Sequence, residues 1–311
     1  MSVAKRFSRI LLLVLLLGGV TLAVLYYLSA RHPSGYVPGL LSAADREAAA
    51  KRLELEKLPQ LLNLANQAQA NATSALRAQA RGEAAPAAST RPIAPVTVTF
   101  TQDEINASLW KQIERDKSSY ERYIKDPYVS LEDGTIVLMA NVPEYGRVAS
   151  ASFEPRLDDK GMLRCDLTSL KLGSLPLPES ILSKHRAKVE NALRSRLPDW
   201  QSKADIGPSG VITPDGRHAA LGQLVLRILN HQPSPAVVFL PKDIQKVSDK
   251  KDKGSVPVKL TNVAVEKGTL TVTVEPMTVE ERTALLERIR QPQQQGVPAP
   301  QSSATAELSD N

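Results

Sequence analysis

The chain of 311 residues contains a single cysteine, Cys165, and few aromatic residues, which make up 4% of it. One cysteine excludes an intramolecular disulfide, so stability must come from a packed core. We interpret Cys165, between Leu163 and Leu167 in an alternating stretch, as a small buried hydrophobe. A nucleophilic thiol would need a histidine and electropositive surroundings. Aromatic residues do not interleave with the cations, so nucleic acid is not an expected partner.

Motifs for metal binding and catalysis are also missing. The chain has four histidines, and none shows the i, i+4 or short paired spacing that zinc sites use. They are His32, His185, His218 and His231. The segment Gly207-Pro208-Ser209-Gly210 lacks the strand-to-helix context of a nucleophile elbow and is interpreted as a surface turn. We therefore expect a protein that is not an enzyme and that has no metal, no cofactor and no catalytic residues.

A long uncharged run follows the basic N-terminus. Residues Ile10–Leu28 carry no charge and follow Lys5, Arg6 and Arg9. As a helix the run spans about 28 Å, close to the hydrocarbon thickness of a bilayer. The cations predict that residues 1–9 are cytoplasmic and that the rest of the chain is extracytoplasmic. A signal peptide is the alternative, but its apolar core would be only about 7 to 15 residues long. We expect a single-pass protein of the bacterial cytoplasmic (inner) membrane.

Composition divides the rest of the chain into three regions. Residues 29–95 are first rich in Ala, Leu and Gln and then, from Glu83 to Pro95, in Ala and Pro, which predicts a helical stalk followed by an extended linker. Residues 96–290 carry periodic apolar patterns and are the expected folded domain. Residues 291–311, rich in Gln, Pro and Ser, lack the apolar content to fold and are expected to form a disordered tail.

A period of two dominates the expected domain. Apolar and polar residues alternate over 96–100, 136–142 and 270–274, and each run predicts a half-buried strand. Short turns with glycine separate the strands, which indicates a mainly antiparallel sheet. In two further strands the alternation changes phase, at Thr168-Ser169 and at Thr261-Asn262. An extra residue there predicts a bulge, and bulges bend sheets, so we expect a strongly curved sheet.

Amphipathic helices should pack on this sheet. A capping box of Thr101 and Glu104 begins one helix, and a second should span Glu179 to about Leu197. A third helix carries an apolar stripe of Leu221, Leu224, Val225, Ile228 and Leu229. The second helix also carries basic residues that are candidates for contact with lipid head groups, with a solvated helix face as the alternative. They are Lys184, Arg186 and Lys188. The expected fold class is therefore α+β.

Several short segments resemble a known pattern. They are 100–106, the turns at Asp133-Gly134 and Lys267-Gly268, and 172–178. Together they resemble the YpmS-type membrane-anchored bacterial proteins and the LmeA-like envelope proteins of actinobacteria, over roughly Val96 to Arg290. The resemblance implies an N-terminal anchor or export signal and an extracytoplasmic domain whose curved sheet around a long helix binds lipid, as in tubular lipid-binding (TULIP-like) domains. It implies no catalytic residues.

An apolar sheet face under amphipathic helices is suited to taking up an acyl chain. The candidate lipid-binding residues on that face are Leu138, Leu170, Leu172, Val263, Leu270 and Val272. We therefore expect a non-catalytic lipid-binding or lipid-handling protein of the bacterial cell envelope, with the membrane bilayer and an acyl lipid as partners. If helix side chains fill the same face, the alternative is a scaffold or assembly factor that binds other envelope proteins.

Overall fold

The computed structural model describes residues 33, 35–39, 41–82, 93–115, 124–177, 179–207, 210–241 and 254–291. The helices are α2 (Ala43–Arg52), the π-helical η1 (Leu53–Lys57), α3 (Leu58–Ala80), α5 (Gln102–Arg115), α7 (Glu179–Ser202), α8 (Pro214–Leu229) and α9 (Val279–Arg290). The strands are β1 (Val96–Thr101), β2 (Lys125–Glu132), β3 (Thr135–Val142), β4 (Arg147–Leu157), β5 (Met162–Leu172), β6 (Leu175–Pro176), β7 (Ser234–Pro235), β8 (Val237–Pro241), β9 (Ser255–Glu266) and β10 (Thr269–Pro276).

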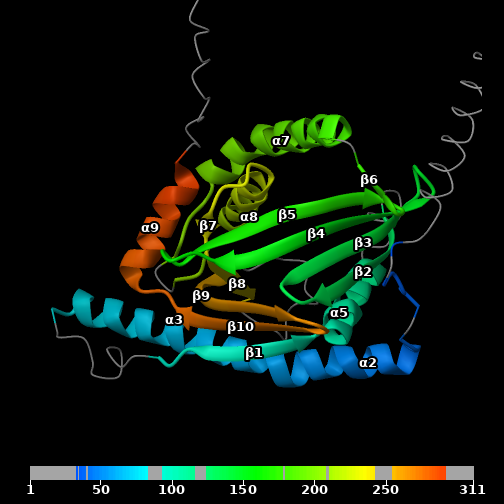
Figure 1. The fold of residues 1–311 in the computed structure, drawn as a ribbon. Helices are drawn as coiled ribbons and strands as arrows, with labels where there is room; N and C mark the ends of the chain where they lie inside the picture. The colour runs from blue at the N-terminus through cyan, green and yellow to red at the C-terminus, as the bar shows by residue number, and fades with distance from the viewer. Residues whose placement is uncertain are drawn as a thin grey trace, which may run out of the picture.

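The strands form two antiparallel sheets (Figure 1). One has the order β1-β10-β9-β8, and the other has the order β2-β3-β4-β5-β6, with β7 paired to β5. The sheets meet where the β2–β3 turn joins the β9–β10 turn: the Gly134 N–H donates to the Val265 carbonyl at 2.9 Å, and the Gly268 N–H donates to the Leu131 carbonyl at 3.0 Å. The predicted α+β class and antiparallel pairing are confirmed.

Both predicted bulges are present, but the predicted strong curvature is wrong. Ser152 pairs with Ser169 and Phe153 with Leu167, which leaves Thr168 as the extra residue of β5. The register of β9 against β10 shifts in the same way and leaves Thr261 as the extra residue. Each bulge bends only its own strand pair. Because the two bulges lie in different sheets, their bends do not add up, and neither sheet is strongly curved.

The described helices do not include a membrane span. None of them is long and apolar enough to cross a bilayer, and the longest, α3 and α7, carry Asn, Gln or charged residues along their length. The run Ile10–Leu28 lies outside the described residues. The described residues therefore contain no counterpart of the predicted transmembrane helix, and this finding corrects the prediction of a single-pass inner-membrane protein with an extracytoplasmic domain.

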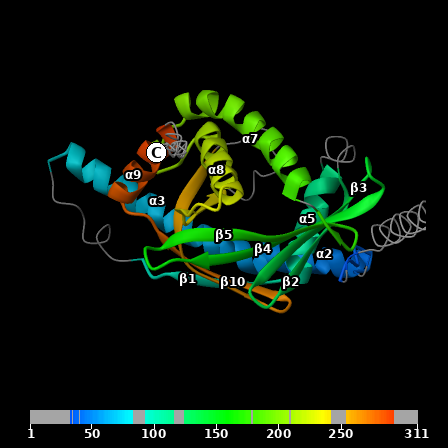
Figure 2. The same ribbon diagram turned by 45° about the horizontal axis from the view of Figure 1, so that its top comes forward.

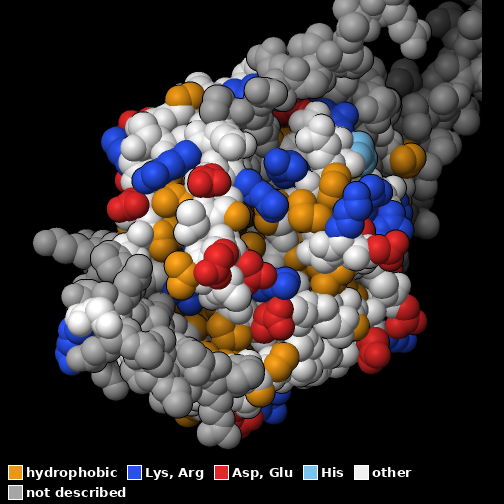
Figure 3. Space-filling view, turned by 90° about the vertical axis from the view of Figure 1, so that its left-hand side faces the viewer, with side chains coloured by type: hydrophobic (Ala, Val, Ile, Leu, Met, Phe, Trp, Pro, Cys, Tyr) orange, Lys and Arg blue, Asp and Glu red, His pale blue; other side chains and the backbone are white. Residues whose placement is uncertain are grey.

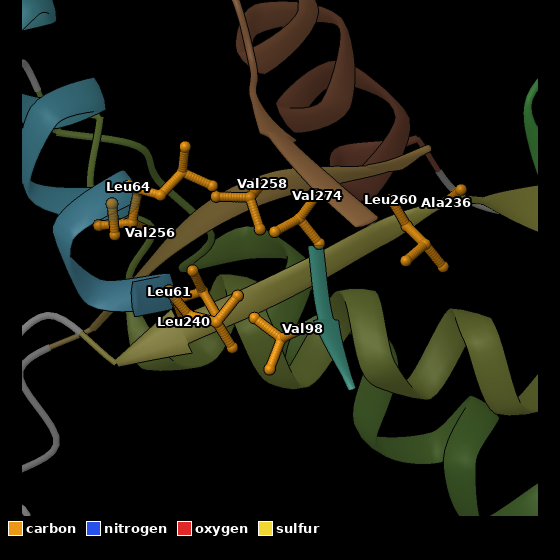
Figure 4. Close-up of a cluster of buried hydrophobic side chains, with 10 residues drawn as sticks. Leu61, Leu64, Val98, Ala236, Leu240, Val256, Val258, Leu260 and Val274 are labelled. Carbon is orange, nitrogen blue, oxygen red and sulfur yellow. The ribbon is translucent and has the colours of Figure 1, made fainter. Parts of the chain in front are cut away.

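Helix α3 contributes to the core of the first sheet. Leu61, Leu64 and Ala65 are buried against Val98 and Val258, which project from the same apolar sheet face (Figure 4). The region expected to form a stalk is thus helical but packs on the folded domain. Most of the expected linker, residues 83–92, and of the expected tail, residues 292–311, lies outside the described residues.

A second core lies among the last three helices. Helices α7, α8 and α9 gather at one end of the molecule, beside β8 (Figures 1 and 2). Leu197, Leu226, Leu285 and Ile289 are buried there, and Phe239 of β8 packs against them. The second predicted helix is confirmed, although α7 continues past Pro198 to Ser202.

Candidate functional site

The three candidate lipid-binding residues from the second sheet lie on one face of β3, β4 and β5. Leu138 of β3 is opposite Ala151 of β4, which is opposite Leu170 of β5. Two residues away on the same face, Ala149 of β4 is opposite Leu172 of β5. Residues directly opposite each other in an antiparallel pair share a face. The face therefore carries leucines on β5 and alanines on β4, while on β3 it carries Leu138 and, opposite Ala149, Ala140.

This arrangement places small side chains between larger ones along β4, and we call these five residues the β4 trough. Its floor is Ala149 and Ala151, and its rims are Leu138 on one side and Leu170 and Leu172 on the other. The rims are two strand spacings apart, about 10 Å. Leu138 is 44% exposed, and the other four residues are half-buried. None of the three leucines belongs to a buried cluster of the described residues.

The other three candidates lie on the first sheet and do not join the β4 trough. Val263 and Val272 are opposite each other on β9 and β10 and pack against the core beneath α3. Leu270 packs against the small cluster of Val129, Leu131 and Val265 that joins the two sheets. The single surface expected from the six residues is therefore divided into a half-open trough and part of a packed core.

Three cavities lined by described residues have volumes of about 310, 260 and 30 Å³. The largest lies between α2 and α5, the second between α9 and the β4–β5 turn, and the smallest among α8, β8 and α9. None of these three has any of the six candidate residues in its lining. An acyl chain on the β4 trough would therefore lie in an open groove and not in one of these cavities.

Helices α7 and α8 carry further exposed apolar residues. α8 contacts both α7 and β5, and α7 begins just after β6 and runs past the β5 edge towards α9 (Figures 1 and 2). Val189 of α7 and Leu221 and Val225 of α8 are 44%, 43% and 40% exposed. The stripe predicted to be buried on α8 thus leaves Leu221 and Val225 exposed, and Ala219, Gly222 and Leu226 are buried instead.

The candidate head-group residues all lie on α7. For Lys184 only the position in the helix is described. The Lys188 side chain is exposed. Arg186 approaches Glu190, with 3.9 Å between Nε and Oε1, and Arg194 lies 4.0 Å from the same carboxylate. Glu190 therefore balances one of the positive charges on this face, and an ion pair near the surface contributes about 0 to 1 kcal/mol.

The groups that catalysis would use are dispersed. Among the described residues, no three His, Cys, Asp or Glu side chains are close enough together to hold a metal ion. Burial, and then the charge of Asp166, raise the pKa of Cys165, which keeps its thiol protonated. The His218 ring lies tilted against Trp200, with 5.7 Å between ring centroids.

The surface near α9 carries charges of both signs. Figure 3 shows Lys and Arg side chains interspersed with Asp and Glu and with small apolar patches. Lys259 is one cation close to acids: its Nζ lies 3.2 Å from both Glu275 and Glu281.

Comparisons with known proteins found no relative of this chain. It matches no protein-family model, no curated protein and no solved structure.

Proposed function

We propose that this protein binds the aliphatic chain of a lipid in the β4 trough and acts in lipid binding or transfer, without catalysis. One observation carries the proposal: leucines rim an alanine floor on a sheet face that stays half-open in the folded chain. Side chains that belonged to a solid core would be covered by a helix or a second sheet. Val189, Leu221 and Val225 are further exposed apolar residues, on the neighbouring helices α7 and α8.

An open trough suits reversible binding. Removing a methylene group from water contributes about 0.8 kcal/mol when it is fully buried. A trough covers a chain from one side only, so each methylene contributes less. Association itself costs about 4 to 15 kcal/mol. A chain of a dozen or more methylenes is therefore needed for net binding, and such binding is weak enough for the lipid to be released again.

A protein partner is the second candidate occupant, as expected for a scaffold. Leu221 and Val225 are one helical turn apart on α8 and both exposed, which is a pattern that partner helices use. The two functions differ in one measurable property. A lipid-binding protein takes up a lipid probe when it is pure, whereas a scaffold does not.

The test compares two leucine-to-aspartate variants. Leu138→Asp places a charge on the rim of the trough, while Leu55→Asp makes the same change on η1, where the side chain is 73% exposed. Both leucines are exposed, so both variants should fold. Titration with a fluorescent long-chain fatty acid should show binding to the wild type and to Leu55→Asp, with at least tenfold weaker binding to Leu138→Asp. Equal affinities for the two variants, or no uptake by the wild type, would refute the proposal.

A second pair separates the trough from the core. Leu172→Trp adds bulk on the open rim, where it should block the trough at little cost in stability. Leu270→Trp adds the same bulk among packed residues, where overpacking costs about 1 to 3 kcal/mol. We expect lost lipid binding with near-normal melting for the first variant and the reverse for the second.

A further inference from the structure

Arg282 occupies a core position of α9. The buried residues of this helix are Arg282, Leu285 and Ile289, which repeat at the spacing of one helix face. Arg282 is 6% exposed. An arginine guanidinium is charged at any ordinary pH, so this position places a positive charge where the helix otherwise buries leucine and isoleucine.

The Arg282 guanidinium has no partner within the described part of the chain. Its Nε is wholly buried without a hydrogen bond. Arg290, on the same helix, makes the contrast clear: its guanidinium donates to the Ala204 carbonyl at 2.8 and 3.0 Å and lies 3.3 Å from Asp205. The same helix thus carries one guanidinium with its hydrogen bonds made and one with none to the described residues.

Glu281, which precedes Arg282 in the sequence, has other partners. Glu281 accepts a hydrogen bond from the Thr278 N–H at 2.9 Å with one oxygen, and its other oxygen lies 3.2 Å from Lys259. Burial lowers the pKa of Arg282, and the charge of Glu281 only partly opposes this. An isolated charge inside a protein is costly, and it is normally matched by an anion.

Gly210 leaves room for this guanidinium. Gly210 is buried with φ +75°, and a Cβ atom there would lie 2.8 Å from Cζ of Arg282 and would collide with its Nη1. The Gly210 N–H donates to the Gly207 carbonyl at 2.8 Å, which closes the turn. Nε is wholly buried without a hydrogen bond, and Gly210 lies against Nη1. The guanidinium is therefore packed beside the Gly210 turn, with hydrogen-bonding capacity left for a further group.

We propose that Arg282 anchors a binding site for a phosphate group beside Gly210. The guanidinium fork matches two oxygens of a phosphate, and a phosphate with up to two negative charges would compensate the buried positive charge. The group has two sources of the same chemistry, inorganic phosphate and the head group of a phospholipid. This site is separate from the β4 trough, and its test does not depend on lipid uptake there.

The test measures the melting temperature of the full chain in mild detergent, with inorganic phosphate or with sodium chloride at equal ionic strength. The wild type should be stabilised by phosphate beyond the effect of chloride. Arg282→Met should lose this response, because it removes two charge-assisted hydrogen bonds, which corresponds to roughly a hundredfold weaker affinity or more. Arg290→Met, which removes a partnered arginine from the same helix, is the matched control and should respond as the wild type does.

Two further measurements address a variant that does not fold and the source of the phosphate group. If Arg282→Met does not fold, Arg282→Lys retains the charge without the fork and should bind phosphate less tightly than the wild type. Binding to phosphatidylglycerol vesicles that requires Arg282 and is competed by phosphate would identify a head group as the source, whereas a phosphate response without such binding would identify the free ion. A wild type with equal responses to phosphate and chloride, or an Arg282 variant with the wild-type response, would overturn the proposal.

Discussion

Replacing Asn106 with alanine should lower the free energy of unfolding by about 2 to 5 kcal/mol. Asn106 lies on α5 beside the outer edge of β2 and is 9% exposed. Its Nδ2 donates to the Val129 carbonyl at 2.8 Å, and its Oδ1 accepts the Val129 N–H at 2.7 Å. The side chain thus takes the place of a further strand at this edge, and alanine removes both hydrogen bonds.

The magnitude follows from what is left behind. Val129 is 6% exposed, so its N–H and carbonyl would lose their partners in a buried place. Each buried backbone group without a partner costs about 1 to 3 kcal/mol, or about 2 to 6 kcal/mol for the two. Alanine is a better helix former than asparagine by roughly half a kcal/mol, which offsets part of the loss.

Urea unfolding monitored by circular dichroism measures this difference. Asn66→Ala is the matched control, because Asn66 is an exposed asparagine on another helix, α3, and its replacement should change stability by less than about 0.5 kcal/mol. If Asn106→Ala were no more destabilising than Asn66→Ala, the two hydrogen bonds would not be holding α5 to the sheet edge.

Two further predictions concern alkaline stability and a glycine. The pKa of Tyr36 is raised to about 12, mainly by burial and then by the charge of Asp126. The stability that this tyrosine contributes is therefore complete below pH 10 and is lost as the pH rises towards 12. Tyr36→Phe should flatten this alkaline loss of unfolding free energy, and an unchanged dependence of that free energy on pH would refute the assignment. Gly254 has φ +88°, and a Cβ there would lie 2.8 Å from Val211 and collide with the Ile212 carbonyl, whereas at Gly268, with φ +80°, it would meet nothing within 4 Å. Gly254→Ala should therefore lower the melting temperature well beyond Gly268→Ala, which bears only backbone strain of about 1 to 3 kcal/mol, and equal melting temperatures would contradict the close approach.

The local features of the fold could be predicted because they depend on residues that are close together in the sequence. The capping box is an example: the Glu104 N–H donates to the Thr101 hydroxyl at 3.2 Å, and the Thr101 N–H donates to the Glu104 carboxylate at 2.9 Å. The bulges at Thr168 and Thr261 were equally visible, because a change of phase in the alternation needs one extra residue. Each of these features depends on fewer than ten residues in a row.

The partition into two sheets could not be predicted in this way. β1 pairs with β10, which is far along the chain, so membership of a sheet depends on contacts that alternation does not encode. Val263 and Leu138 both belong to runs in which apolar and polar residues alternate, but the two residues lie on different sheets. The six candidate residues are therefore divided: the leucines from β3 and β5 share one face of the second sheet, and the residues from β9 and β10 lie on the first sheet.

The packing of α3 on the first sheet was not predicted, for a related reason. Its core contacts come from Leu61, Leu64 and Ala65, with Ala68 also buried, and asparagine and glutamine lie between them. That stripe is narrow and partly alanine, so it resembles an exposed stalk. A narrow stripe is nevertheless sufficient when a helix lies flat on a sheet, because small residues allow close approach and the sheet supplies the large side chains.

The size of the residues also explains which side of α8 is buried. Large residues were expected to face the core, yet the buried side of α8 carries Ala219 and Gly222, and a Cβ at Gly222 would lie 3.2 Å from Leu197 of α7. Only small residues permit helices to pack that closely. Because they take the inner side, Leu221 and Val225 are displaced to the open side. The exposure of Leu221 and Val225 is thus a consequence of the close contact between α7 and α8, and replacing Gly222 with a larger residue should disturb both together.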